Sequence, residues 1–456
     1  MTNEVHPVDQ VLPLKQMFTL GLQHMAVSYV GSVAVPLIIA GALGLSTEET
    51  IILISTTLFC SGVATLLQTV GFWKFGVRLP ILNGVTFSSV TPIIVIGSMP
   101  GVGIPGISGA VMAGGVFIML MAPFLGRLRR LFPPVVTGCI VTVIGVQLLP
   151  VAYQWVGGGR GHPEYGSPLF LLIAVSVIGI ILVLNRYGSP LLRNLAVLIG
   201  MALGAIVAFM LGAGDFHGVD EAPWLTVPLP MHFGVPTFAL IPFLTIAIVM
   251  IVQMVESMGL FLAIGDLVGK KVSREDVTNG LRANGLASSI AGMFAAFPFI
   301  AHMENVGLVI LSGVRSRWVV AMSGVLMCAV ALIPKAGAVL AATPAPALGG
   351  AAIAMFGVVT AAGIQSLAKV DYTHNRYNIL IVAFTLAISL VPVLAPALFK
   401  QLPEWSQPFL HSSVVVACIA SVLLNLLLNG CGKQEEHEAQ GHFEAPSELS
   451  SRSSLT

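Results

Sequence analysis

Apolar runs of about 20 residues follow one another along almost the whole chain, and this feature restricts the fold more than any other. A run of that length can cross the hydrocarbon core of a bilayer as one helix. Charged residues supply only 9% of the sequence, whereas soluble domains carry about 25%. So few charges cannot cover a water-soluble surface. The sequence therefore predicts an all-α polytopic membrane protein in a lipid bilayer.

The apolar runs number fourteen, and the third and the tenth are irregular. The third contains Asn83-Gly84 near its start and Pro92 in its middle, and the tenth is short. We expect broken helices at both places, because Gly and Pro interrupt helices. The predicted segments lie at 17–41, 50–70, 81–98, 106–125, 134–152, 168–185, 195–213, 237–262, 284–300, 302–313, 318–334, 346–367, 377–398 and 409–429.

The positive charges support this map. If the N-terminus and every second loop lie in the cytoplasm, all Lys and Arg residues lie inside except Arg160, Lys335 and Lys400. Cytoplasmic loops are expected to hold the positive excess, and one miscounted helix would destroy the alternation. Both termini are therefore predicted to be cytoplasmic. A net charge of +1 gives no indication of a nucleic-acid partner.

Two segments also carry an internal repeat. Residues 134–146 read PVVTGCIVTVIGV and residues 346–358 read PALGGAAIAMFGV, so both follow P-x3-G-x6-G-V. They open the fifth and twelfth segments, seven apart, and the two broken segments are also seven apart. An odd offset inverts one repeat relative to the other. Inverted repeats with paired broken helices are typical of secondary transporters, which bind substrate at the breaks. The alternative is that Gly and Pro are simply frequent in membrane helices.

Two acidic residues, Glu256 and Glu304, fall well inside apolar segments. A charge near the bilayer centre costs from about 2.5 kcal/mol upward, so its default interpretation is functional. Gln253 precedes Glu256 by one helical turn and shares its face. That face could present an amide and a carboxyl to one ligand or to a proton path. The alternative is a protonated Glu256 bonded to a neighbouring helix.

Glu304 and Asn305 follow Pro298 and precede a short apolar run. A helix that starts there has unpaired N–H groups, which together with the side chains offer donors and acceptors to a flat heterocycle. The alternative is an Asn cap beside a solvated Glu. In the partner break, Phe87 could stack on a ring and Thr86 could bond to it, although both are also ordinary packing residues.

Two histidines remain open. His24, in the first span, could relay a proton or hold a neighbouring helix in place. His302 adjoins the predicted site and could lie at its extracellular mouth. The sequence contains no metal-ligand spacing, phosphate loop or nucleophile elbow, so we expect no metal, no cofactor and no enzymatic activity.

At these residues the sequence resembles the nucleobase–ascorbate transporters, also called the nucleobase:cation symporter family. Their signature is [Q/E/P]-N-x-G-x-x-x-x-T-[R/K/G], and residues 304–313 read ENVGLVILSG. Only Ser312 departs from it, and the hydroxyl is retained. The stretches LGLQH, VTFSSVTP, VESMG and GGAAIAMFG extend the resemblance over nearly the whole membrane region. The sequence is most similar to bacterial urate and xanthine permeases.

The resemblance implies a homodimer of chains with 14 transmembrane segments in a 7+7 inverted repeat, with short strands in segments 3 and 10. Each chain would have a core domain and a gate domain, and each domain would be assembled from two stretches of sequence. The implied division is a cytoplasmic tail (1–16), the first core stretch (17–133, segments 1–4), the first gate stretch (134–236, segments 5–7), the second core stretch (237–343, segments 8–11), the second gate stretch (344–429, segments 12–14) and a disordered cytoplasmic tail (430–456).

The resemblance also implies a substrate site between the short strands. Glu256 and Glu304 would read the nucleobase, and backbone near Phe87 and Met303 would add contacts. Asn305 and Thr86 would shape the site. The residues implied in proton coupling or affinity are Glu256, His24 and Asn284.

The implied function is proton-coupled import of xanthine or urate across the bacterial inner membrane by alternating access. Three departures leave alternatives open. Glu304 replaces the Gln of many purine carriers and is shared with uracil carriers, so a uracil:proton symporter is the first alternative. Leu260 and Asn284 stand where some xanthine carriers have Asp, which leaves the proton path open. A passive nucleobase facilitator is the second alternative.

Overall fold

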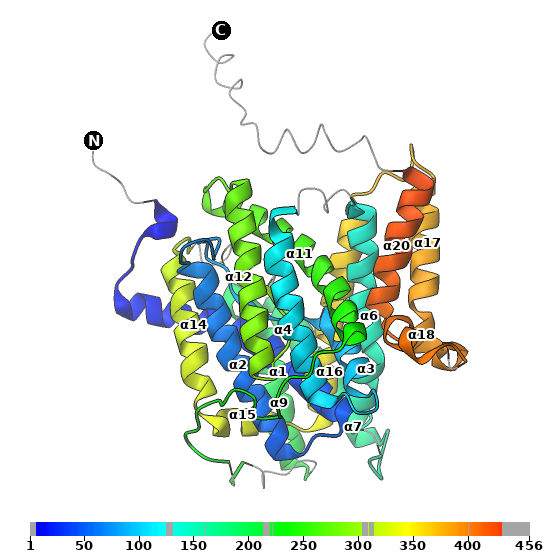
Figure 1. Cartoon of the computed structure of the whole chain (residues 1–456). Helices are drawn as coiled ribbons and strands as arrows, with labels where there is room; N and C mark the ends of the chain where they lie inside the picture. The colour runs from blue at the N-terminus through cyan, green and yellow to red at the C-terminus, as the bar shows by residue number, and fades with distance from the viewer. Residues whose placement is uncertain are drawn as a thin grey trace, which may run out of the picture.

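Helices make up most of the chain in the computed structural model (Figure 1). The structure describes residues 6–124, 131–159, 161–212, 219–220, 222–302, 309, 314–399 and 401–430. The helices of these regions are α1 (Leu14–Leu43), α2 (Thr47–Thr69), α3 (Val90–Gly97), α4 (Gly103–Met121), α6 (Pro134–Val156), α7 (Pro168–Tyr187), α8 (Pro190–Asn194), α9 (Ala196–Met210), α11 (Leu240–Val268), α12 (Arg274–Met293), α14 (Arg317–Ala331), α15 (Pro334–Ala341), α16 (Ala345–Leu367), α17 (Tyr377–Ser389), α18 (Val391–Leu394), α19 (Gln407–Leu410) and α20 (Ser413–Asn429).

Eight helices of the described chain are long and apolar enough, by length and composition, to cross a membrane. The shorter apolar helices are Phe87–Gly97, Ala196–Met210, Arg317–Ala331 and Ser413–Asn429. The predicted helical membrane class is therefore confirmed, and the count of fourteen segments stays a prediction. The predicted tenth segment lies almost entirely outside the described residues.

The ninth segment begins earlier in the chain than its hydropathy predicts. The apolar run starts at residue 284, but α12 already begins at Arg274. Its first turns carry Arg274, Glu275 and Asp276, so a search for apolar runs cannot find them. Ser273 starts the helix instead: its Oγ accepts from the backbone N of Asp276 at 3.1 Å, and the Asp276 carboxylate accepts from the Ser273 N at 2.9 Å. This reciprocal cap defines a helix start without any apolar signal.

Two short strands, both fully buried, pair in the interior of the helix bundle. β1 (Asn83–Val85) and β2 (Phe299–Ala301) are antiparallel, with Gly84 opposite Ile300. β1 lies in the third predicted segment, as expected. β2 lies at the end of the ninth predicted segment and not in the tenth. The chain leaves α12 at Met293 and becomes extended around Pro298, which cannot continue a helix.

In each strand, one backbone N–H donates a hydrogen bond to a hydroxyl group on a neighbouring helix. The N–H of Asn83 in β1 donates to Thr65 Oγ1 of α2 at 3.0 Å. The N–H of Phe299 in β2 donates to Ser288 Oγ of α12 at 3.0 Å. Backbone groups at membrane depth need such partners wherever they leave a helix. A hydroxyl on each flanking helix therefore permits an extended segment in an apolar interior.

Pairs of helices pack with their backbones in contact. α2 packs on α14, where a Cβ on Gly62 would lie 2.5 Å from the carbonyl oxygen of Gly324. α4 packs on α12, where a Cβ on Gly285 would lie 2.6 Å from the carbonyl oxygen of Gly115. Small residues allow this approach and are typical of membrane helix interfaces.

α6 and α16, which carry the repeated P-x3-G-x6-G-V motif, pack against each other along their lengths. Gly138 near the start of α6 faces Leu367 at the end of α16. Gly349 near the start of α16 faces Val156 at the end of α6. The two helices are therefore antiparallel, as an odd offset between repeats requires.

The residues before α1 fold onto the end of the helix bundle. The short 3-10 helix η1 (Pro7–Asp9) buries Val8 completely. Asp9 pairs with Arg317 at 2.6 Å, and the Trp318 indole N–H donates to the Asp9 carbonyl at 3.2 Å. Ser316 Oγ donates to the Gln10 carbonyl at 2.6 Å. Figure 1 shows η1 and the C-terminal end of α20 at the same end of the bundle.

Candidate functional site

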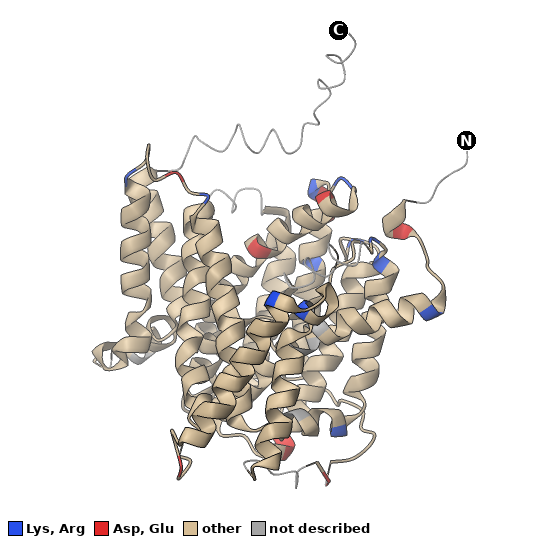
Figure 2. Ribbon diagram, turned by 180° about the vertical axis from the view of Figure 1, so that it is seen from behind, with Lys and Arg blue, Asp and Glu red and all other residues tan. Residues whose placement is uncertain are grey.

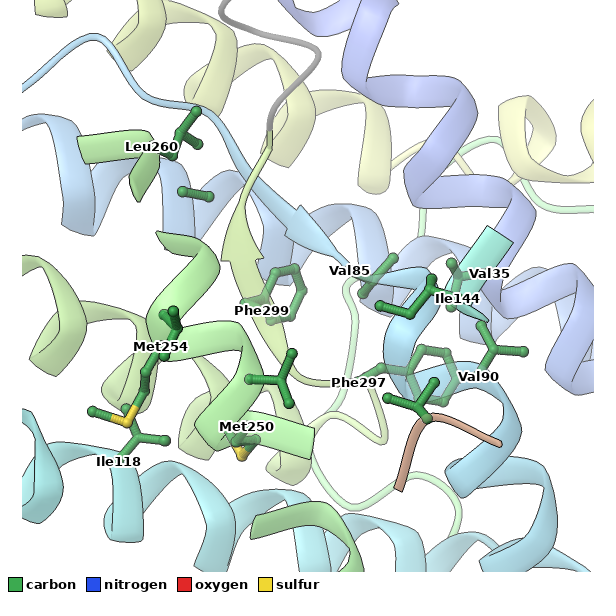
Figure 3. Close-up of a cluster of buried hydrophobic side chains, with 14 of the residues drawn as sticks. Val35, Val85, Val90, Ile118, Ile144, Met250, Met254, Leu260, Phe297 and Phe299 are labelled. Carbon is green, nitrogen blue, oxygen red and sulfur yellow. The ribbon is translucent and has the colours of Figure 1, made fainter. Parts of the chain in front are cut away.

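The strand pair lies within a cluster of buried hydrophobic side chains. Figure 3 shows Val85 of β1 and Phe299 of β2 together with Val35 of α1, Ile144 of α6 and Met254 of α11. Each of these side chains is at least nine-tenths buried. Such a surrounding excludes water, so the polar groups that project into it depend on one another for hydrogen bonds.

Gln253 joins α11 to the break in the third segment. Its side chain is 4% exposed, and Nε2 donates to Ser88 Oγ at 3.1 Å. Ser88 lies in the short 3-10 helix η2 (Phe87–Ser89), directly after β1 and Thr86. Gln253 Oε1 is buried, and no residue of the described chain forms a hydrogen bond with it. A buried acceptor without a partner costs about 1–3 kcal/mol, so this oxygen is a notable exception.

Glu256 lies one turn after Gln253, near the middle of α11, and is partly buried. Gln253, on the predicted shared face, contacts the break, and the same direction for the Glu256 carboxyl stays a prediction. Ser257, the residue after Glu256, is fully buried and takes part in a second polar group of contacts. The carboxyl of Glu256 thus lies on a helix that is fixed on both sides by hydrogen bonds.

Asn284 of α12 is the centre of that second group. Its Oδ1 accepts from Gln68 Nε2 of α2 and from Asn83 Nδ2 of β1, both at 2.7 Å. Its Nδ2 donates to Ser257 Oγ of α11 at 2.9 Å. One amide therefore connects two helices and a strand to α12. An amide does not titrate near neutral pH, so Asn284 contributes position, and the coupling role implied for it stays a prediction.

Phe87 and Thr86 have structural partners in the break. The Phe87 ring meets the Phe356 ring of α16 edge to face, with centroids 5.3 Å apart and planes at 82°. Thr86 Oγ1 accepts from the backbone N of Ser88 at 3.2 Å and lies 2.8 Å from Ser88 Oγ. Thr86 therefore caps η2, and Phe87 links the break to α16. Their contact with a substrate stays a prediction.

The two histidines are both buried. His24 of α1 is 1% exposed. His302 is 8% exposed, which corrects its expected position at an extracellular mouth. Its Nε2 lies 3.0 Å from the Val85 carbonyl, which only accepts, so Nε2 carries the proton. Nδ1 then accepts from Ser28 Oγ at 3.2 Å. The ring lies directly over Gly84, where a Cβ would collide with it.

Three of the predicted substrate-binding residues belong to a stretch that the structure does not describe. Met303, Glu304 and Asn305 lie outside the described residues. His302, the residue before them, donates its N–H to the Leu82 carbonyl at 2.9 Å and so extends the strand pairing. Among the described residues, no group of three or more His, Cys, Asp or Glu could hold a metal ion.

Comparison with known proteins decides the family. The model of a permease family, Xan_ur_permease, matches residues 15–398. The chain belongs to the nucleobase–ascorbate transporter family. The resemblance carried by the signature residues is thus confirmed, and this family consists of permeases and not of enzymes.

Relatives of this nucleobase–ascorbate transporter cover nearly its whole length. The uric acid transporter UacT of Escherichia coli (strain K12) is 43% identical over 424 residues, which are 93% of this chain and 88% of UacT. The xanthine permease of Bacillus subtilis (strain 168) is 38% identical over 422 residues, which are 92% of this chain and 96% of the permease. With eight apolar helices, the chain is an integral membrane protein.

A solved structure shares the fold. The transmembrane domain of the cyanobacterial bicarbonate transporter BicA aligns with a TM-score of 0.59 at 15% identity, over 92% of this chain and 99% of that domain. At this identity the likeness concerns the fold alone.

Sequence reasoning singled out Gln253, and the family resemblance singled out Asn284. The candidate stretch 83–88 contained Ser88, but its contact with Gln253 was not predicted, and Ser257 and Gln68 were missed. The available signal was a polar side chain in an apolar run. Serine is too frequent in membrane helices for that signal to stand out, whereas Gln68 could have been identified by the same argument as Gln253.

Proposed function

We propose that this nucleobase–ascorbate transporter imports a purine nucleobase, xanthine or urate, together with a proton. The similarity to a uric acid transporter and a xanthine permease over more than nine-tenths of the chain supports this substrate class. Transport would follow alternating access across the bacterial inner membrane. The observation that carries the proposal is the contact between Gln253 and Ser88, which joins the helix of Glu256 to the broken third segment.

In this proposal the nucleobase binds where the two breaks meet. Glu256 and Glu304 bond to ring N–H groups, and backbone near Phe87 and Met303 adds contacts. Asn305 and Thr86 shape the site. The pairing of β1 with β2 supports this arrangement, because it holds the residues before Phe87 beside those before Met303. One carboxyl takes up the coupling proton, since two adjacent carboxylates would repel each other and an acidic purine.

The 7+7 inverted repeat belongs to the proposal. Several packed helix pairs have a counterpart seven segments away: α4 with α12 corresponds to α2 with α14, and α7 with α9 corresponds to α17 with α20. The antiparallel pair α6 and α16 corresponds to itself. This pattern supports a core domain of segments 1–4 and 8–11 and a gate domain of segments 5–7 and 12–14. The family resemblance adds a homodimer.

The orientation in the membrane follows the same reasoning. Figure 2 shows most of the Lys and Arg residues in the upper half of the view, at the end where the described chain begins and where α20 ends. The positive excess belongs on the cytoplasmic side, which supports cytoplasmic termini.

The test is uptake of labelled xanthine by cells that lack their own purine carriers. We expect accumulation against the gradient that collapses with a protonophore, and strong competition by urate but weak competition by uracil, hypoxanthine and ascorbate. Uptake that only equilibrates and ignores the protonophore would indicate a passive facilitator. Uracil as the strongest competitor would favour a uracil symporter, which the glutamate at position 304 makes the second candidate.

A further inference from the structure

The unsatisfied carbonyl of Gln253 suggests a role beyond holding two segments together. The side chain is more than nine-tenths buried, and its Oε1 has no hydrogen-bond partner among the residues that the structure describes. It lies one turn from Glu256 on α11 and contacts η2, where the broken third segment resumes its helix. A buried acceptor that no described residue satisfies would gain a hydrogen bond from a ligand that brings its own donor.

The surrounding hydroxyls are compatible with an amide whose carbonyl end is free. Thr86 Oγ1 lies 2.8 Å from Ser88 Oγ, so the Ser88 hydroxyl can donate to Thr86 and accept from Gln253 Nε2. With Nε2 held in this way, Oε1 points away from Ser88 and keeps both lone pairs. In this arrangement the amide presents an acceptor that points away from Ser88.

We propose that Gln253 is a specificity-determining residue whose Oε1 accepts a hydrogen bond from the imidazole N–H of an oxidised purine. This inference rests on the proposed function, in which Glu256 and Glu304 bind other ring N–H groups. Xanthine and urate carry an N–H in the five-membered ring, whereas uracil has no such ring. A pyrimidine would leave the buried Oε1 unsatisfied, so Gln253 selects purines against pyrimidines.

The experiment removes the donor from the ligand and the acceptor from the protein. Inhibition constants for xanthine uptake are measured with xanthine and with its two analogues in which a ring oxygen replaces the imidazole nitrogen at position 7 or 9. Neither analogue carries an N–H in the five-membered ring, so wild type should bind both about 3- to 10-fold more weakly than xanthine. In Gln253→Met, which retains the length of the side chain, xanthine and the two analogues should bind equally.

Two further variants distinguish a Gln253 that binds the purine from a Gln253 that only holds α11 against η2. Ser88→Ala removes the partner of Nε2 but retains the acceptor, so it should weaken both ligands and keep their ratio. If Ser88→Ala abolishes the ratio as Gln253→Met does, Gln253 acts only as a brace and the inference is wrong. Gln253→Glu retains an acceptor oxygen and should restore the ratio. Each ratio compares two ligands in the same variant, so the amount of carrier in the membrane cancels. If Gln253→Met does not insert into the membrane, Gln253→Leu takes its place.

The two proposals fail in different ways. Absence of xanthine uptake by wild type would overturn the proposed function and this inference with it. Wild-type uptake of xanthine with no preference over either oxygen analogue would overturn this inference alone, and so would an unchanged preference in Gln253→Met.

Discussion

The region around β1 and the helix α6 each contain a buried side-chain amide, and the two amides differ in their hydrogen bonds. Asn284, beside β1, takes part in hydrogen bonds with Gln68, Asn83 and Ser257. Gln147 of α6 is 5% exposed, and within the described part of the chain neither polar atom of its amide has a hydrogen-bond partner. A directed network has one favourable geometry, whereas apolar packing tolerates displacement. The difference separates a fixed region around β1, which directed hydrogen bonds hold together, from a helix that is held mainly by apolar packing.

Glu256→Gln should have the largest effect on the fixed region's function. The change retains the size of the side chain and one acceptor oxygen but removes a group that can exchange a proton. We expect accumulation of labelled xanthine to fall to the background of cells without the carrier. The protein should still insert and unfold at the wild-type temperature. Uphill uptake by this variant would refute the coupling role of Glu256.

Asn284→Ala should have the largest effect on stability. It removes the described partner of Asn83 Nδ2 and of Ser257 Oγ and one of the two partners of Gln68 Nε2. Each lost hydrogen bond in this buried setting costs about 1–3 kcal/mol, so the expected loss is roughly 3 kcal/mol or more. Thermal unfolding of the purified carrier in detergent measures this. A melting temperature equal to that of wild type would break the comparison, because the network would then not fix the region.

Gly62→Ala tests how closely the helices of the fixed region approach. The new methyl group would meet the carbonyl of Gly324 in α14, and overpacking of this kind costs about 1–3 kcal/mol. Gly357→Ala in α16 is the matched control, because nothing lies within 4 Å of its Cβ position. We expect a lower melting temperature for the first variant only. Equal melting temperatures would show that α2 and α14 can separate without loss.

Phe356→Leu concerns the contact that crosses between the two regions. Phe356 is fully buried and meets Phe87 edge to face. The substitution removes an aromatic pair worth about 0.5–1.5 kcal/mol while keeping most of the volume. The KM for xanthine should change by more than the melting temperature does, since Phe87 belongs to the proposed site. A shift in melting temperature with unchanged KM would assign Phe356 to packing alone.

Gln147→Leu should have the smallest effect and the opposite sign. Removing an amide with no partner relieves its desolvation cost, so the variant should be as stable as wild type or more stable by about 1 kcal/mol. Asn284→Ala, measured beside it, supplies the contrast. A clear loss of stability in Gln147→Leu would show that the two amides are equivalent and would remove the basis of the comparison.

Hydropathy predicted the helices well because an apolar run is a local property. It failed where a helix begins with charges, as at Arg274, and where an extended segment is satisfied by distant hydroxyls, as for Phe299 and Ser288. Gln253 could be identified because a long amide is conspicuous in an apolar run. The partners of Asn284 and the burial of His302 depend on which segments meet, and no local pattern encodes that.

The fold of η1 against α14 has a practical consequence. Val8 is buried, Asp9 pairs with Arg317, and the Gln10 carbonyl accepts from Ser316. The stretch before the first helix is therefore fixed to that end of the bundle. Removing a dozen residues there would remove these contacts and expose the apolar surface that Val8 covers. An affinity tag is therefore safer after residue 430 than fused close to Val8.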